Sequence, residues 1–183
     1  MNRINSRAKG NQFELQIAKE LSYTLFPYLK EKNLDATSLP FRRTPMSGGW
    51  STTISEDIIF NGSNPYLSEE DKNFNWWYAV ECKWHATYNL ESLITSREKS
   101  IITQWWNQTI NEAYLTHKEP LLIFKKNGHE PLFMMKYKQN YSRLLDGTCA
   151  IFNFEGYSVI VDTFERLKVE LIKCRRLFID FKE

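Results

Sequence analysis

Cysteine and histidine are scarce in this sequence, and neither is clustered. The chain of 183 residues contains three cysteines, Cys82, Cys149 and Cys174, and no Cys-x-x-Cys pair, and its three histidines lie far apart. This scatter argues against a structural zinc site and against a disulfide framework. A dispersed, odd number of cysteines is typical of a protein that stays in a reducing cytosol.

A strong charge excess and long apolar runs are also missing. The net charge is only +2, so any binding to nucleic acid must come from local clusters of lysine and arginine rather than from bulk charge. The sequence begins without an apolar signal segment and lacks the run of about 18 apolar residues that a membrane helix needs. We therefore expect a protein that is neither secreted nor membrane-spanning and that acts in the cytoplasm, or in the host cytoplasm if it is viral.

The composition that remains suits one folded domain. Hydrophobic residues make up 42% and charged residues 25% of the chain, as in soluble globular proteins of this length. Aromatic residues are abundant at 15%. We expect the tryptophan pairs Trp76-Trp77 and Trp105-Trp106 to lie in the core or in a dimer interface rather than to stack on bases.

Helices and strands are expected to alternate along the chain. Apolar residues recur with helical spacing from Phe13 onward and predict a first helix over residues 8–30, with Pro27 marking a bend or a stop near its end. A second long helix is expected over residues 90–116, and Asp162 is placed to cap a last helix from Thr163 to about Ile172. Strands are expected at residues 41–45, 57–60, 76–83, 121–124, 132–135, 150–152 and 158–161.

The connections between these elements carry turn residues and polar stretches. Adjacent glycines predict a loop at Met46–Ser51, and Asn127-Gly128 predicts a hairpin turn. The polar residues 61–75 predict an exposed hairpin loop or insertion. Residues 31–40 form a polar connection. The order of the elements predicts a single α/β or α+β domain.

The pattern Glu81-Cys82-Lys83 carries the sharpest chemical signal. Side chains two apart on a strand point to the same face, so a carboxylate and an ammonium group project together from an otherwise apolar strand. Alone, this common tripeptide is better explained by a solvated ion pair on an edge strand. Asp57 begins the preceding strand and can meet Glu81 if the two strands are neighbours. Two carboxylates beside a lysine suit Mg²⁺, which prefers oxygen ligands.

Glu14 adds a third acid. It lies on the apolar face of the first helix, since Ile17, Ala18 and Leu21 follow it at helical spacing. A buried carboxylate needs compensation, which a metal ion, a lysine or a hydrogen-bond network would supply. The alternative is that Glu14 lies at the edge of the apolar stripe and reaches solvent.

Together these residues resemble the PD-(D/E)xK nuclease superfamily, and within it the archaeal-type Holliday junction resolvases and related phage resolvase-like nucleases. Order and spacing match over roughly residues 6–135. Glu56 stands where the family usually has a proline, the insertion after Asp57 is longer than in the smallest resolvases, and residues 136–183 have no counterpart. The matching motifs are Arg7-x-Lys9-Gly10-x-x-x-Glu14, Arg43-Thr44-Pro45-Met46-Ser47-Gly48, Asp57-Ile58-Ile59 and Val80-Glu81-Cys82-Lys83.

The resemblance implies a restriction-endonuclease-like α/β fold, with a central mixed β-sheet flanked by helices in a single domain of residues 1–183. The core would span about residues 6–135, with residues 136–183 as a C-terminal extension packed on it. Glu14, Asp57 and Glu81 would be the acids linked to Mg²⁺, for which Mn²⁺ can substitute, and Lys83 the catalytic lysine.

Two polar residues join this set with their alternatives open. Ser47 would match a serine near the scissile phosphate, or it is a turn serine of the loop. A glutamine on the helix after Lys83 often faces the metal in such nucleases. Gln108 is favoured here over Gln104, and a surface glutamine is the alternative for either.

Four basic residues close in sequence to these elements are expected to contact DNA: Arg7, Lys9, Arg42 and Arg43. Lys125 and Lys126 fit a solvated surface better, and His85, on the strand face of Lys83, is either a bystander or a phosphate contact.

The leading hypothesis is a metal-dependent DNA endonuclease that hydrolyses phosphodiester bonds, selects branched DNA and acts as a homodimer. The preference for branched DNA rests wholly on the resemblance. One alternative is a general or restriction-like nuclease of duplex DNA, because one fold supports several such activities. An alternative of another class is a non-catalytic DNA-binding module on a nuclease fold.

Overall fold

The structure, a computed structural model, describes residues 6–44, 56–137, 149–154 and 156–180. It divides into two compact units, Met1–Trp77 with Leu171–Glu183 and Tyr78–Glu170. The predicted loop at Met46–Ser51 lies outside the described residues, and the single-domain organisation with a packed C-terminal extension stays a prediction. Among the described helices, none is long and apolar enough to span a membrane.

In the first unit, α1 (Ser6–Leu25) ends earlier than the predicted residue 30. Its buried face includes Phe13, Ile17 and Leu21, as the helical spacing predicts. Phe26 leaves the helical region with φ −130°, and Pro27 then opens a 3₁₀ helix, η1 (Pro27–Lys32). The proline stops the α-helix because it has no N–H to donate, and its fixed φ suits the first position of a new helix.

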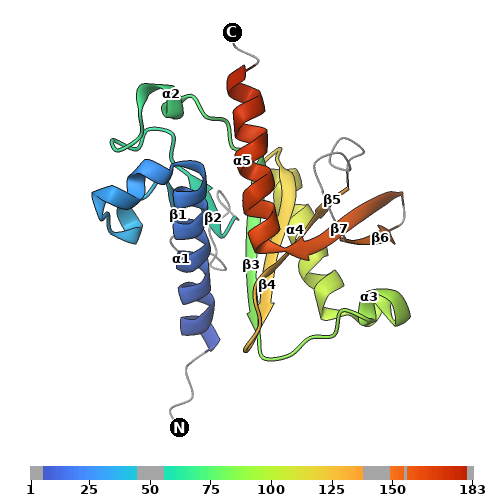
Figure 1. The fold of residues 1–183 in the computed structure, drawn as a ribbon. Coiled ribbons are helices and arrows are strands. Elements are labelled where there is room, and N and C mark those ends of the chain that lie inside the picture. Colours follow the sequence, from blue (N-terminus) through green and yellow to red (C-terminus); the bar gives the residue numbers. More distant parts are fainter. Residues whose placement is uncertain (1–5, 45–55, 138–148, 155, 181–183) are drawn as a thin grey trace. The chain divides into compact units, whose positions relative to one another are not determined.

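A short antiparallel strand pair packs beside α1 in this unit (Figure 1). After η2 (Ala36–Ser38), β1 (Phe41–Arg43) pairs antiparallel with β2 (Ile58–Phe60), and Arg43 lies opposite Ile58. Aromatic rings fill the space between the elements, with centroids 4.8 to 6.5 Å apart. These rings belong to Phe26, Phe41, Phe60, Phe74 and Trp76.

The predicted exposed insertion at residues 61–75 is partly wrong. It contains a short helix, α2 (Glu69–Lys72), whose N-cap Ser68 accepts a hydrogen bond from the Asp71 backbone N–H. Asn64, Leu67 and Asp71 are buried. Polar residues suggested solvent exposure here, but hydrogen bonds compensate the buried groups: the Asn64 amide donates to the Ser38 carbonyl at 2.9 Å.

The second unit is built on a mixed sheet (Figure 1). Its strands are β3 (Tyr78–His85), β4 (Glu119–Lys126), β5 (Leu132–Lys136), β6 (Ala150–Phe154) and β7 (Tyr157–Thr163), in the order β3-β4-β5-β7-β6. The β3–β4 pair is parallel and the other pairs are antiparallel. Gly128, at φ 74°, makes the predicted turn between β4 and β5, in a conformation that favours glycine. The predicted α/β class with a mixed sheet is confirmed.

The single long helix predicted over residues 90–116 is three pieces: α3 (Ser92–Thr95), η3 (Arg97–Lys99) and α4 (Ile101–Leu115). Ser96 leaves the helical region at φ −151°, and the hydroxyls of Ser92 and Ser100 bond to each other at 2.7 Å. Serine side chains that form such local bonds compete with continuous helix. The helical spacing of apolar residues correctly predicted helix on both sides of the break. It did not reveal the break itself, because the apolar pattern continues past Ser96 and Ser100.

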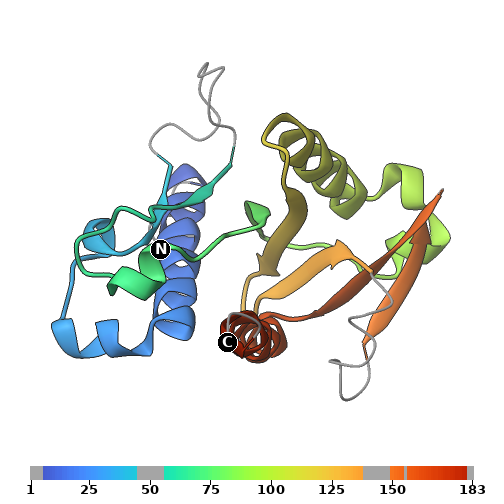
Figure 2. The same cartoon turned by 90° about the horizontal axis from the view of Figure 1, so that it is seen from above.

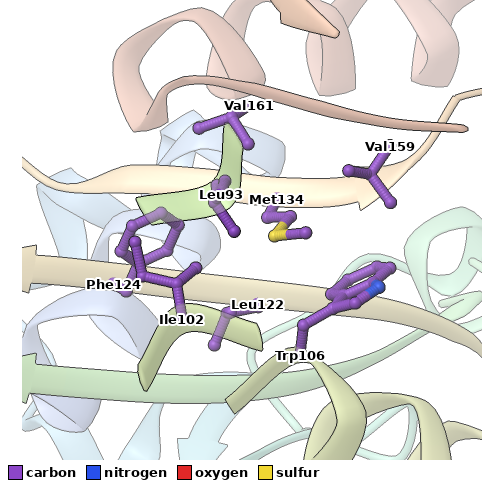
Figure 3. Close-up of a cluster of buried hydrophobic side chains, with 8 residues drawn as sticks. All are labelled: Leu93, Ile102, Trp106, Leu122, Phe124, Met134, Val159 and Val161. Carbon is purple, nitrogen blue, oxygen red and sulfur yellow. The ribbon is translucent and has the colours of Figure 1, made fainter. Parts of the chain in front are cut away.

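The core of the second unit lies between α4 and the sheet. Figure 3 shows the cluster, in which Trp106 and Ile102 of α4 pack with Leu122 and Phe124 of β4. Figure 2 shows α4 on one face of the sheet and the start of α5 (Phe164–Asp180) on the other. The remaining members of the cluster are Leu93, Met134, Val159 and Val161.

The last helix is longer than predicted and passes from the second unit into the first. At its start, the Asp162 carboxylate accepts a hydrogen bond from the Thr163 N–H at 2.7 Å and lies 3.4 Å from Arg166. Of the tryptophans, Trp76 and Trp106 are buried as expected, whereas Trp77 is 54% exposed.

Candidate active site

In the second unit, β3 positions Glu81 and Lys83 on one face of the sheet. Glu81 pairs with Leu122 and Lys83 with Phe124, and both of these partners belong to the core beneath α4. Directly paired residues share a face, so the acid and the lysine project toward α4. The Lys83 ammonium contacts the Glu81 carboxylate, and Glu81 is only 2% exposed. An ionised pair is therefore embedded in an otherwise apolar face.

A glutamine of α4 completes this part of the site. The Gln108 side-chain amide donates to Glu81 Oε1 at 3.0 Å and to Glu112 Oε1 at 2.9 Å. Gln104, one turn earlier, and Gln108 are both exposed residues, and the hydrogen bond shows that Gln108 reaches the acid. Glu112 was missed in the sequence, although its position four residues after Gln108 puts both on one helix face.

In the first unit, Glu14 is buried on α1 and is bound by Arg43 of β1. The Arg43 Nε donates to the Glu14 carboxylate, and its Nη2 donates to Asn11 Oδ1 at 2.9 Å. The compensation expected for Glu14 thus includes an arginine rather than a lysine. Arg43 was assigned to DNA from the sequence, and its guanidinium is held here beside two side chains of α1.

Asp57 directly precedes β2 and is buried, 6% exposed. Its carbonyl accepts a hydrogen bond from the Thr44 N–H at 2.9 Å, so the β1–β2 ladder continues one step beyond the Arg43–Ile58 pair. Glu56 is also buried, 3% exposed. Two adjacent buried acids before a strand were not predicted, because Glu56 was read only as a replacement for the family's proline.

The candidate residues are thus distributed over both units. Glu14, Arg43 and Asp57 belong to the first, and Glu81, Lys83 and Gln108 to the second. Arg7 and Arg42 are exposed and Lys9 is partly buried, whereas Ser47 lies outside the described residues. Within the described part of the chain, no group of three or more histidine, cysteine or acidic residues is placed to hold a metal ion.

A mixed sheet that carries a buried Glu-x-Lys pair, next to a helix glutamine, is the arrangement of a PD-(D/E)xK nuclease. The sequence matches the family described as "Phage putative PDDEXK endonuclease" over residues 5–177. The chain therefore belongs to this family of phage nucleases, and the superfamily predicted from its motifs is confirmed.

One curated relative gives an independent comparison. Protein D14 of Escherichia phage T5 is 26% identical to the chain over 165 residues, which cover 88% of this chain and 91% of that protein. The similarity therefore extends over nearly the full length of both proteins. The family match itself runs to residue 177 and so includes most of the C-terminal part for which the motifs offered no counterpart. No solved structure matches the chain.

Proposed function

We propose that this protein is a Mg²⁺-dependent endodeoxyribonuclease that hydrolyses phosphodiester bonds in branched DNA, with Mn²⁺ as an effective substitute. The observation that carries the proposal is the buried Glu81 carboxylate, held by both Lys83 and Gln108. Moving a carboxylate and an ammonium group from water into a largely apolar face costs free energy that their attraction need not recover, so a pair of this kind suggests a functional site. Membership of the endonuclease family supplies that function.

The acids fit a hard divalent cation. Carboxylate oxygens are the protein ligands that Mg²⁺ prefers, and Asp57 and Glu81 are both buried acids at strand positions. We propose that these two hold the metal and that Glu14 supports it directly or through water. When bound, the metal would lower the pKa of its water and offset the charge that develops on the phosphate.

The remaining site residues act on the water and the phosphate. Lys83 would orient the attacking water and stabilise negative charge as it develops. Gln108 donates to Glu81 and so fixes the rotamer of that carboxylate, while its contact with Glu112 holds the amide in place. Ser47 would lie near the scissile phosphate, as the family resemblance implies.

DNA is expected to contact the basic residues of the first unit. Arg7 and Arg42 are exposed and suit phosphate contacts. Lys9 would add a third contact. Arg43 would either contact a DNA phosphate itself or hold Glu14, which it binds, in position. A homodimer that acts in the cytoplasm, or in the host cytoplasm, would let two such sites cut opposing strands of a junction.

The decisive experiment compares cleavage of a four-way junction with cleavage of a linear duplex of the same arms, with and without Mg²⁺. Faster Mg²⁺-dependent cutting of the junction is expected. Equal cutting of both substrates would reduce the proposal to the general duplex nuclease. No cleavage of any DNA with Mg²⁺ or Mn²⁺ would favour the non-catalytic binding module.

Variants of the site test the assigned roles. Asp57→Asn, Glu81→Gln and Lys83→Ala should each lower the cleavage rate on the order of 10²-fold or more while DNA binding is retained. Lys136→Ala is a matched control, since Lys136 is also a partly buried lysine on a strand of the same sheet as Lys83. If Lys136→Ala lowered cleavage as much as Lys83→Ala does, the catalytic role proposed for Lys83 would be contradicted.

A further inference from the structure

The parallel strands β3 and β4 end side by side in a group of cationic and aromatic residues. Trp84 pairs with Lys125 and His85 pairs with Lys126. The sequence contains no acid between residues 82 and 90 or between residues 120 and 129. This end of the strand pair therefore carries His85, Lys125 and Lys126, whereas Glu119 begins β4 at the opposite end.

Both lysines are held over aromatic rings. The Lys125 Nζ lies 4.7 Å from the centroid of the Trp84 ring, and the Lys126 Nζ lies 5.6 Å from that of Tyr88. The Trp84 indole N–H also donates to Asn127 Oδ1 at 2.9 Å, which fixes the ring. A lysine that is already positioned by a ring loses less conformational freedom when it binds a ligand.

The spacing relates these lysines to the candidate catalytic lysine. Lys126 and its partner His85 share the face of Lys83, because His85 follows Lys83 by two residues on β3. At a rise of about 3.3 Å per residue, this row lies about 7 Å beyond Lys83. That distance is comparable with one nucleotide step along a DNA strand. Lys125 lies on the opposite face of the same strand ends.

We propose that Lys126, on the face of Lys83, binds the DNA phosphate next to the scissile one and that Lys125 binds a further phosphate at the edge of the sheet, so that the paired ends of β3 and β4 form a backbone-binding subsite. The inference rests on the proposed function, because it places the scissile phosphate at Lys83. The subsite would recognise the charged DNA backbone and would not distinguish one base sequence from another. It differs from the expectation, drawn from the sequence, that Lys125 and Lys126 belong to a solvated surface.

Salt-dependent binding tests the subsite. Affinity of the full-length protein for a labelled duplex and for a labelled four-way junction is measured by fluorescence anisotropy over a salt series without Mg²⁺. Each of Lys125→Ala and Lys126→Ala should lower the slope of log K against log salt by about 0.9, the value of one lost phosphate contact. Lys126→Arg, which keeps the charge, should restore the slope, and Lys136→Ala should leave it unchanged.

Kinetics add a second readout. Lys126→Ala should raise KM several-fold, while kcat at saturating DNA stays within about twofold of the parent, because the subsite positions DNA without touching the reacting atoms. Slopes equal to the parent's in both alanine variants would overturn the proposal. If slopes change but no DNA is cut, the subsite stands and the nuclease proposal fails; if DNA is cut and the slopes do not change, only the subsite fails.

Discussion

The buried carboxylate of Asp71 offers the sharpest test of how the first unit is held together. Asp71 is 5% exposed, accepts a hydrogen bond from the Tyr28 hydroxyl at 2.7 Å and contacts the guanidinium of Arg175 from α5. The guanidinium also lies over the Phe26 ring, 4.8 Å from its centroid. The C-terminal helix is therefore tied to the insertion and to η1 by one network.

The structure gives the expected size of a perturbation. Removing one partner of a fully buried ion pair costs about 3–5 kcal/mol, but the Arg175 side chain is 20% exposed, so water screens part of the interaction. We expect Arg175→Ala to lower the free energy of unfolding by about 2 kcal/mol. For a chain of this length the midpoint of thermal unfolding should fall by about 4–8 °C. Asp71→Asn should lose about 1–2 kcal/mol, because the amide oxygen still accepts from Tyr28.

Urea denaturation of the two single variants and the double variant forms a double-mutant cycle. We expect a coupling energy of about 1 kcal/mol or more between Asp71 and Arg175. The exposed pair Glu69–Lys72 of α2 is the matched control, since Glu69 is 90% exposed, and its cycle should give less than about 0.5 kcal/mol. Effects at Asp71 and Arg175 that add within about 0.3–0.5 kcal/mol would show that the network does not tie the helix down.

Three further predictions concern single positions. Gln108→Ala should slow Mg²⁺-dependent cleavage about tenfold with unchanged unfolding, because Glu81 loses its amide partner, whereas Gln104→Ala, one turn away, should leave the rate unchanged. Gly10→Ala should raise the free energy of unfolding by about 0.5–1 kcal/mol in denaturation experiments, since a Cβ there would meet its nearest neighbour at 3.8 Å; a loss of stability would contradict the helical assignment. Burial raises the pKa of Tyr88 to about 12 from 10.0, so the unfolded chain loses this proton first and stability should fall as the pH rises from about 10 to about 12; denaturation across this range should show a smaller fall in Tyr88→Phe.

The elements that the sequence predicted well are those in which local composition and burial agree. The strands β4 and β5 are short apolar runs joined by residues 127–131, which include Asn127-Gly128, and a connection this short leaves antiparallel pairing as the simplest outcome. Helix α4 was recognisable because its apolar residues recur at helical spacing and face the sheet. The errors lie at boundaries, such as Pro27 and the serines before α4, where local hydrogen bonding competes with a continuing pattern.

The contacts of the candidate site could not be predicted, because they join residues far apart in the sequence. Arg43 reaches Glu14 across 29 positions and Gln108 reaches Glu81 across 27. Each contact depends on the register of a strand and the rotation of a helix, and a one-residue shift in a strand would turn the side chain to the other face. The sequence identified the acids, and it named Lys83 and Gln108 as neighbours of Glu81. It did not identify Arg43 as the partner of Glu14.

Glu14 and Glu81 differ in the role that their surroundings indicate. Both Glu14 and Glu81 are buried and bonded to a cation, Arg43 in one case and Lys83 in the other, so burial alone does not separate a structural pair from a catalytic one. The difference lies in what surrounds each pair. The Glu81 carboxylate also receives an amide from Gln108, and β3 continues from it toward the cationic ends of the strand pair. The guanidinium of Arg43 instead bonds both Glu14 and Asn11 of the same helix. A cation that holds two side chains of one helix fixes that helix on its strand. The Lys83 ammonium group lies two residues before the proposed phosphate-binding subsite, and there it would be placed to act on the phosphate. We therefore propose that the chemistry centres on Glu81 and Lys83, and that Arg43 holds Glu14 in the place from which it would support the metal.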